Sequence, residues 1–147
     1  MKVQLILLVD DNDADNEFHE LVIRKAAVAE NILCFSSSLK ALAYLEKGLA
    51  TENPLEFPLP DLGFFDINMP AMNGFELLDE LRKLPDPYGR RAGLKIAMLT
   101  GSLNPDDERR TLEKYGDIVL GYQIKPLTGP IIGQLLETAL GRAKTPM

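Results

Sequence analysis

The chain has 147 residues, a length typical of one domain, and 46% of them are hydrophobic, which is enough for a packed core. A net charge of −6 argues against a nucleic-acid-binding surface, because lysine and arginine are needed to neutralise a phosphate backbone. The single cysteine excludes an internal disulfide, and the apolar run near the N-terminus is too short to span a bilayer. We therefore expect a soluble cytoplasmic protein that binds neither nucleic acid nor membrane.

Short apolar runs alternate with segments of helical periodicity along the whole chain. The apolar runs, which we interpret as strands, span residues 5–9, 31–35, 62–65, 94–99 and 118–124. Sequences able to cap or start a helix follow them, at Asn12, residues 36–38, Asn73, Asn104 and Thr128. Loops are predicted at residues 50–60 and 85–93, and the last helix is predicted to end at Gly141.

The first predicted helix carries Phe18, Leu21, Val22 and Ala26 at the spacing of one helix face, which predicts its apolar side. His19, the only histidine, lies among acids, and we expect it to be exposed and inert.

This alternation predicts an α/β protein with an open parallel sheet, doubly wound, with helices on both faces. Ligands of such sheets bind beyond the carboxyl ends of the strands. The residues at those ends are Asp10 and Asp11 after the first strand, Asp66 after the third, Thr100 after the fourth and Lys125 after the fifth. An acid pair, a third acid, a hydroxyl and a lysine are thus expected along one edge of the sheet.

Three carboxylates at one edge repel one another. At about 4 Å and an effective dielectric constant of about 20, each close pair costs roughly 4 kcal/mol. Three pairs would cost on the order of 10 kcal/mol, which is comparable to the stability of a small domain. A divalent cation with oxygen ligands, for which Mg²⁺ is suited, and the Lys125 ammonium would offset this repulsion. The same groups are those needed to stabilise a phosphoryl group during its transfer to Asp66.

Four segments in this order, LILLVDD (5–11), DINMPAMNG (66–74), MLTGS (98–102) and YQIKP (122–126), resemble response regulator receiver domains of the CheY-like superfamily. The resemblance covers nearly the whole chain, and it implies a flavodoxin-like (βα)5 fold with strand order 2-1-3-4-5. It further implies a single-domain regulator with a receiver domain at residues 1–141 and a tail at 142–147. The function implied is that of a phosphoacceptor switch in two-component signalling, and not that of an enzyme with its own substrate.

The resemblance implies roles for the acidic residues. Asp66 would be the phosphoacceptor and also a ligand of Mg²⁺. Asp11 would bind the metal directly, Asp10 more often through water, and the backbone carbonyl of Asn68 would complete the protein ligands.

It also implies roles for the other strand-end residues. Thr100 and Lys125 would contact the phosphoryl group, and Pro126 would follow a cis peptide bond. Tyr122 would be the switch aromatic that rotates when Thr100 moves inward. The expected partners are a sensor histidine kinase or phosphotransfer protein and a downstream protein that binds helix 4, strand 5 and helix 5, with a homodimer possible.

Structural interpretations of the same residues stay open. Asp10 and Asp11 could be a solvated helix N-terminus, where acids favour the helix dipole. Thr100 could be a turn residue, Lys125 a surface lysine and Tyr122 a core aromatic. A calcium loop beginning at Asp11 is disfavoured, because its sixth position lacks glycine and its twelfth lacks glutamate.

Two other functions remain as alternatives. A phosphatase of the haloacid dehalogenase type also uses a strand-end aspartate, Mg²⁺ and a lysine, but it needs acids at a later strand end. The only acid after Lys125 is Glu137, inside the last predicted helix. A receiver fold that acts as an adaptor without phosphorylation is the second alternative, although such chains usually lose an acid or the lysine.

Overall fold

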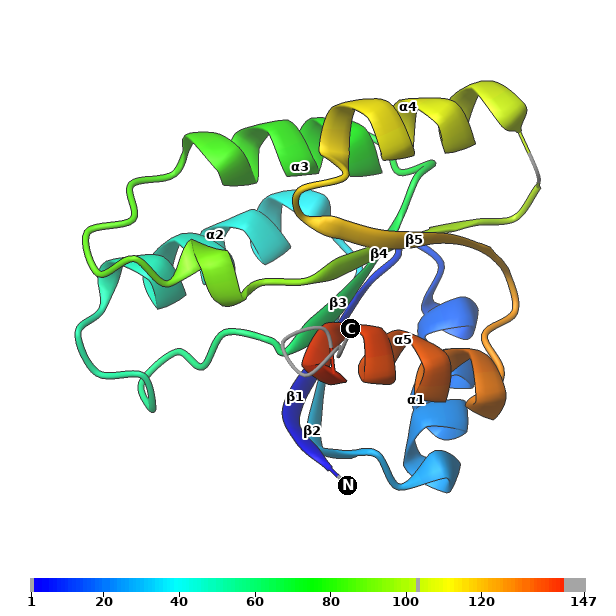
Figure 1. Cartoon of the computed structure of the whole chain (residues 1–147), viewed down its shortest axis with the longest axis horizontal. Helices are drawn as coiled ribbons and strands as arrows, with labels where there is room; N and C mark the ends of the chain where they lie inside the picture. The colour runs from blue at the N-terminus through cyan, green and yellow to red at the C-terminus, as the bar shows by residue number, and fades with distance from the viewer. Residues whose placement is uncertain (1, 103, 142–147) are drawn as a thin grey trace.

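The structure of the protein, a computed structural model, describes residues 2–102 and 104–141. Its centre is a five-stranded parallel sheet in the order β2-β1-β3-β4-β5, as predicted (Figure 1). The strands are β1 (Val3–Val9), β2 (Ala29–Phe35), β3 (Leu62–Asp66), β4 (Ile96–Thr100) and β5 (Val119–Ile124). β1 and β3 are buried along nearly their full length, which explains why they are continuous apolar runs in the sequence.

Helices cover both faces of the sheet, with α2, α3 and α4 on one side and α1 and α5 on the other (Figure 1). The helices are α1 (Asp13–Ala26), α2 (Ser38–Ala50), α3 (Gly74–Lys83), α4 (Pro105–Tyr115) and α5 (Gly129–Gly141). Two apolar clusters result, one on each face of the sheet. This confirms the predicted doubly wound α/β fold.

Capping residues begin the helices where the sequence predicts. The side chains of Asn12, Ser37, Asn73 and Asn104 each accept a hydrogen bond from a backbone N–H in the first turn. α5 reaches Gly141, the last residue described, so the predicted tail at 142–147 lies outside the described residues.

The buried face of α1 differs from the prediction. Phe18 and Leu21 are exposed, whereas Asn16, His19 and Ile23 are buried. The Asn16 amide explains the rotation of the helix, because it donates to the backbone carbonyl of Asp10 at 2.9 Å and so faces the end of β1.

His19 follows Asn16 on this inward face. The expectation that His19 is exposed was wrong, since only 2% of its surface is accessible. Burial lowers the pKa of this imidazole, although the nearby Asp15 carboxylate acts in the opposite direction.

Gly74 lies where the chain has no room for a side chain. A Cβ at this position would stand 2.5 Å from the backbone oxygen of Asp66 and 2.8 Å from the Met98 side chain. The Gly74 N–H donates to the Ile67 carbonyl at 2.9 Å, which fastens the start of α3 beneath the end of β3. The glycine therefore lets α3 begin in direct contact with the residue that follows the strand.

We expect Gly74→Ala to lower the free energy of unfolding by about 1–3 kcal/mol, because the clash is with backbone that cannot rotate away. The matched control is Gly133→Ala in α5, where a Cβ meets nothing within 4 Å. Alanine is the better helix former, so this change should raise stability by about 0.5–1 kcal/mol. Urea unfolding of both variants measures the difference, and an equal effect of the two substitutions would contradict the steric account.

Candidate functional site

The three acidic residues predicted at the strand ends lie together. Asp10 and Asp11 follow β1 and Asp66 ends β3, and β1 and β3 are adjacent strands. One carboxylate oxygen from each residue lies within 4.8 Å of the others. Asp10 and Asp66 are buried, whereas Asp11 is exposed, so the group, here called the acidic site, opens to solvent on one side.

Lys125 reaches this acidic site from the end of β5. Its Nζ lies 2.7 Å from an oxygen of Asp10, 2.8 Å from Asp15 and 3.3 Å from Asp66. Its backbone N–H donates to the carbonyl of Thr100 at 2.8 Å, which fixes where the side chain starts. Burial alone would lower the pKa of the Lys125 ammonium, but its carboxylate partners raise it overall, so the lysine stays charged.

Burial and charge act together on Asp66. Desolvation is the largest cause and the neighbouring Asp10 carboxylate the next, and they raise the pKa of Asp66 to about 6. Lys125 acts in the opposite direction without cancelling them. The environment therefore disfavours the ionised form that a nucleophilic carboxylate needs, unless a further cation is present.

The donor set fits a hard divalent cation. The buried Asp10 oxygen nearest Lys125 has the ammonium at 2.7 Å, and a carboxylate oxygen has a second lone pair that can bind another ligand. The other Asp10 oxygen accepts from the backbone N–H of Asn12 at 3.0 Å, which orients the carboxylate. With the exposed Asp11 beside it, the acidic site offers only oxygen atoms, the ligands that Mg²⁺ prefers.

Thr100 and Tyr122 are linked to the connection between β4 and α4. The buried Thr100 hydroxyl donates to the backbone oxygen of Ser102 at 2.9 Å. The half-buried Tyr122 hydroxyl accepts from the backbone N–H of Asn104 at 3.3 Å. The two predicted switch residues thus contact the same connection from neighbouring strands.

Two residues of this region were missed by sequence reasoning. Asp15 hydrogen-bonds Lys125, and Asn16 joins the ends of β1 and β2 by donating to the carbonyls of Asp10 and Phe35. Both lie in the first turns of α1, directly beyond the acid pair, and that position is the signal that could have identified them. Asn68 lies exposed two residues after Asp66, and the Lys125–Pro126 peptide bond is cis.

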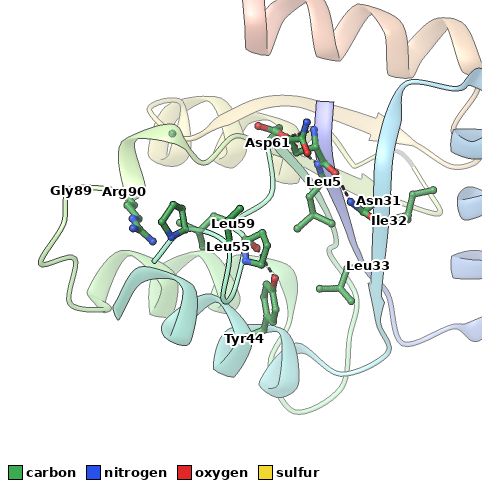
Figure 2. Close-up of a pocket in the computed structure, with 14 residues that line it drawn as sticks. Leu5, Asn31, Ile32, Leu33, Tyr44, Leu55, Leu59, Asp61, Gly89 and Arg90 are labelled. Carbon is green, nitrogen blue, oxygen red and sulfur yellow. Dashed lines mark hydrogen bonds between the residues drawn. The ribbon is translucent and has the colours of Figure 1, made fainter. Parts of the chain in front are cut away.

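A separate cavity of about 980 Å³ is lined by residues other than those of the acidic site. Figure 2 shows these lining residues. Leu5, Leu33, Tyr44 and Leu59 line it, together with parts of the loops at 50–60 and 85–93. Asp61, before β3, accepts hydrogen bonds there from backbone N–H groups near the start of β1. The cavity is therefore at the amino-terminal edge of the sheet and mostly apolar. Although it is large, it is not where we expect phosphoryl chemistry.

A sequence profile described as the response regulator receiver domain matches residues 6–127. The chain belongs to this family. Receiver domains are phosphoacceptor switches of two-component systems that typically bind Mg²⁺ at an acidic cluster and interact with histidine kinases and phosphotransfer proteins. The fold and the grouped carboxylates agree with that membership.

Similar proteins include a response regulator and a histidine kinase. The chain is 31% identical to the response regulator Rcp1 of Synechocystis over 104 residues, which is 71% of this chain and 66% of that protein. It is 30% identical to the histidine kinase CKI1 of Arabidopsis thaliana over 129 residues, which is 86% of this chain but 11% of the kinase. The chain therefore spans less than two thirds of these relatives.

A solved structure agrees closely with the receiver fold of this chain. A two-component response regulator from Cytophaga hutchinsonii has a TM-score of 0.83 and 28% identity, covering 96% of this chain and 99% of that one. Among residues 2–102 and 104–141 of the present receiver, no helix is long and apolar enough to cross a bilayer.

The raised pKa of Asp66 predicts how stability depends on pH without Mg²⁺. Between the ordinary pKa of 3.8 and about 6, the folded receiver holds the proton more tightly than the unfolded chain, so stability falls as pH rises through this window. We expect Asp66→Asn to raise the free energy of unfolding at pH 7 by on the order of 2–3 kcal/mol, because it removes the ionised group.

The gain from Asp66→Asn should shrink towards pH 4, where the native carboxyl group is protonated, and also when Mg²⁺ is added to the wild type. Urea unfolding at pH 4 and pH 7 measures it. If Asp66→Asn were no more stable than the wild type at pH 7, the ionised Asp66 carboxylate would not destabilise the folded protein.

Proposed function

We propose that this receiver domain accepts a phosphoryl group on Asp66 from the phosphohistidine of a sensor histidine kinase or phosphotransfer protein. The observation that carries the proposal is the single-edge arrangement of Asp66, the two other carboxylates of the acidic site and Lys125. Asp66 is the member that is both buried and at the end of the central strand β3, with the ammonium 3.3 Å away. A buried carboxylate beside an ammonium can act as the nucleophile for phosphoryl transfer.

In the proposed reaction, a carboxylate oxygen of Asp66 attacks the phosphorus atom of the donor. The P–O bond to Asp66 forms as the P–N bond of the phosphohistidine breaks. The electron pair of the broken bond goes to the imidazole nitrogen, which takes a proton from solvent. Later hydrolysis by water releases inorganic phosphate and returns the carboxylate.

Asp10, Asp11, Asp66 and the backbone carbonyl of Asn68 are the proposed ligands of Mg²⁺. The carboxylates supply the hard oxygen atoms, and exposure of Asp11 leaves room for metal-bound water. When bound, Mg²⁺ neutralises charge on the transferred phosphoryl group. Without it, the raised pKa of Asp66 makes this carboxylate a poor acceptor near pH 6.

Lys125 and Thr100 are the proposed contacts for the phosphoryl oxygens. Lys125 has three ammonium donors and already faces Asp66, so one donor can turn to a phosphoryl oxygen. The Thr100 hydroxyl, now bonded to Ser102, would have to exchange that bond for the phosphoryl group.

This exchange supports a switch in the connection before α4. Loss of the Thr100–Ser102 bond would free the connection that the Tyr122 hydroxyl also contacts, so Tyr122 could turn inward. The surface affected includes Leu112 on α4 and Ile124 on β5, both of them exposed apolar residues. A downstream protein is proposed to bind this α4-β5-α5 surface. A cytoplasmic location and a possible homodimer stay predictions from the sequence.

The test is labelling with acetyl phosphate and Mg²⁺, followed by mass spectrometry of the intact protein. We expect a phosphoryl mass increase in the wild type that is lost in Asp66→Asn, because the nucleophile is gone. Asp13→Asn is the matched control, since Asp13 is an exposed acid of the same region and lies outside the acidic site.

The control should be labelled as the wild type is, and removal of Mg²⁺ with a chelator should abolish the reaction. Labelling that persists in Asp66→Asn would place the acceptor elsewhere. A wild type that takes no label, either from acetyl phosphate or from candidate kinases, would favour an adaptor that works without phosphorylation.

A further inference from the structure

One partner of the Lys125 ammonium lies outside the acidic site. Its Nζ donates to Asp15 Oδ2 at 2.8 Å, nearly as close as Asp10 Oδ2 at 2.7 Å and closer than Asp66 at 3.3 Å. Asp15 belongs to α1 and Lys125 follows β5, so the bond joins segments 110 residues apart in the sequence. The Lys125 side chain is only 16% exposed, so Asp10, Asp15 and Asp66 share an ammonium that has little access to water.

The capping arrangement of α1 leaves the Asp15 carboxylate available for this contact. In a capping box, an acid at this third helical position would turn back to the backbone N–H of the capping residue. Here the N–H of the capping residue Asn12 donates instead to Asp10 at 3.0 Å. The Asp15 backbone N–H bonds to the Asn12 side chain, which sets the first turn, and its carboxylate is free to extend towards Lys125.

A phosphoryl group on Asp66 would meet Asp15 in two unfavourable ways. Its oxygens would compete for the ammonium that Asp15 now shares with Asp10 and Asp66, and its negative charge would lie near another carboxylate. Both effects would weaken the binding of a phosphoryl group at Asp66. The Asp15 side chain is 38% exposed, so water and salt would weaken both of them.

We propose that Asp15 is a positioning residue that competes with the phosphoryl group for Lys125 and thereby weakens phosphoryl binding at Asp66. This inference rests on the proposed phosphoacceptor function and adds a residue to it. Asp15 acts through Lys125, without contact to the reacting atoms. Its effect is to raise the donor concentration needed to fill the site.

Binding of beryllofluoride, a phosphoryl mimic, tests the proposal when followed by fluorine NMR at saturating Mg²⁺. We expect Asp15→Asn to bind the mimic about two- to fivefold more tightly than the wild type, the range of a partly exposed ion pair. The gain should shrink as salt is raised, because a screened charge competes less. Asp15→Glu keeps the charge and can still reach Lys125, so it should bind as the wild type does.

Asp13→Asn is the matched control, since it removes one acid from the same helix turn but has no contact with Lys125. An equal change in Asp13→Asn and Asp15→Asn, no change in Asp15→Asn, or weaker binding by it would overturn the role of Asp15. The same would hold if Asp15→Glu bound as tightly as Asp15→Asn. Failure of the wild type to bind the mimic, or retention of binding in Asp66→Asn, would instead count against the proposed function.

Discussion

Repulsion among the carboxylates of Asp10, Asp11 and Asp66 is the constraint around which this receiver is organised. Their oxygens lie within 4.8 Å of one another, and two of the three side chains are buried. Lys125 offsets part of the repulsion but leaves the pKa of Asp66 raised to about 6. The acidic site of the folded protein thus carries more negative than positive charge. This excess is the reason why a phosphoryl group there would depend on a bound metal ion.

The rest of the fold holds this unfavourable group in place. Adjacent parallel strands β1 and β3 bring the acids to one edge, and apolar clusters on both faces of the sheet stabilise those strands. Asn16 ties the ends of β1 and β2 together, and Gly74 allows α3 to begin against the backbone of Asp66. The stability of the packed layers therefore offsets the electrostatic cost of the acidic site, whose residues lie where the strands end and the loops begin.

The fold was predictable because its determinants are local: buried parallel strands are apolar runs, and Asn12, Asn73 and Asn104 cap helices by contacts within one turn. The acids at the strand ends followed from topology. The orientation of α1 could not be predicted in this way, because it depends on the contact of Asn16 with a strand end. The apolar pattern that includes Phe18 predicted the wrong buried face, since Phe18 is exposed. Asp15 was missed for the same reason, since its partner lies 110 residues away.

Calorimetric titration with Mg²⁺ shows whether the excess negative charge of the acidic site is neutralised by a metal ion. We expect the wild type to bind one ion saturably. Asp11→Asn should lose most of this binding while staying folded, since Asp11 is the exposed member of the acidic site. Asp13→Asn should bind as the wild type does. Absence of saturable binding in the wild type, or binding that Asp11→Asn leaves unchanged, would show that the acidic site does not hold a metal ion.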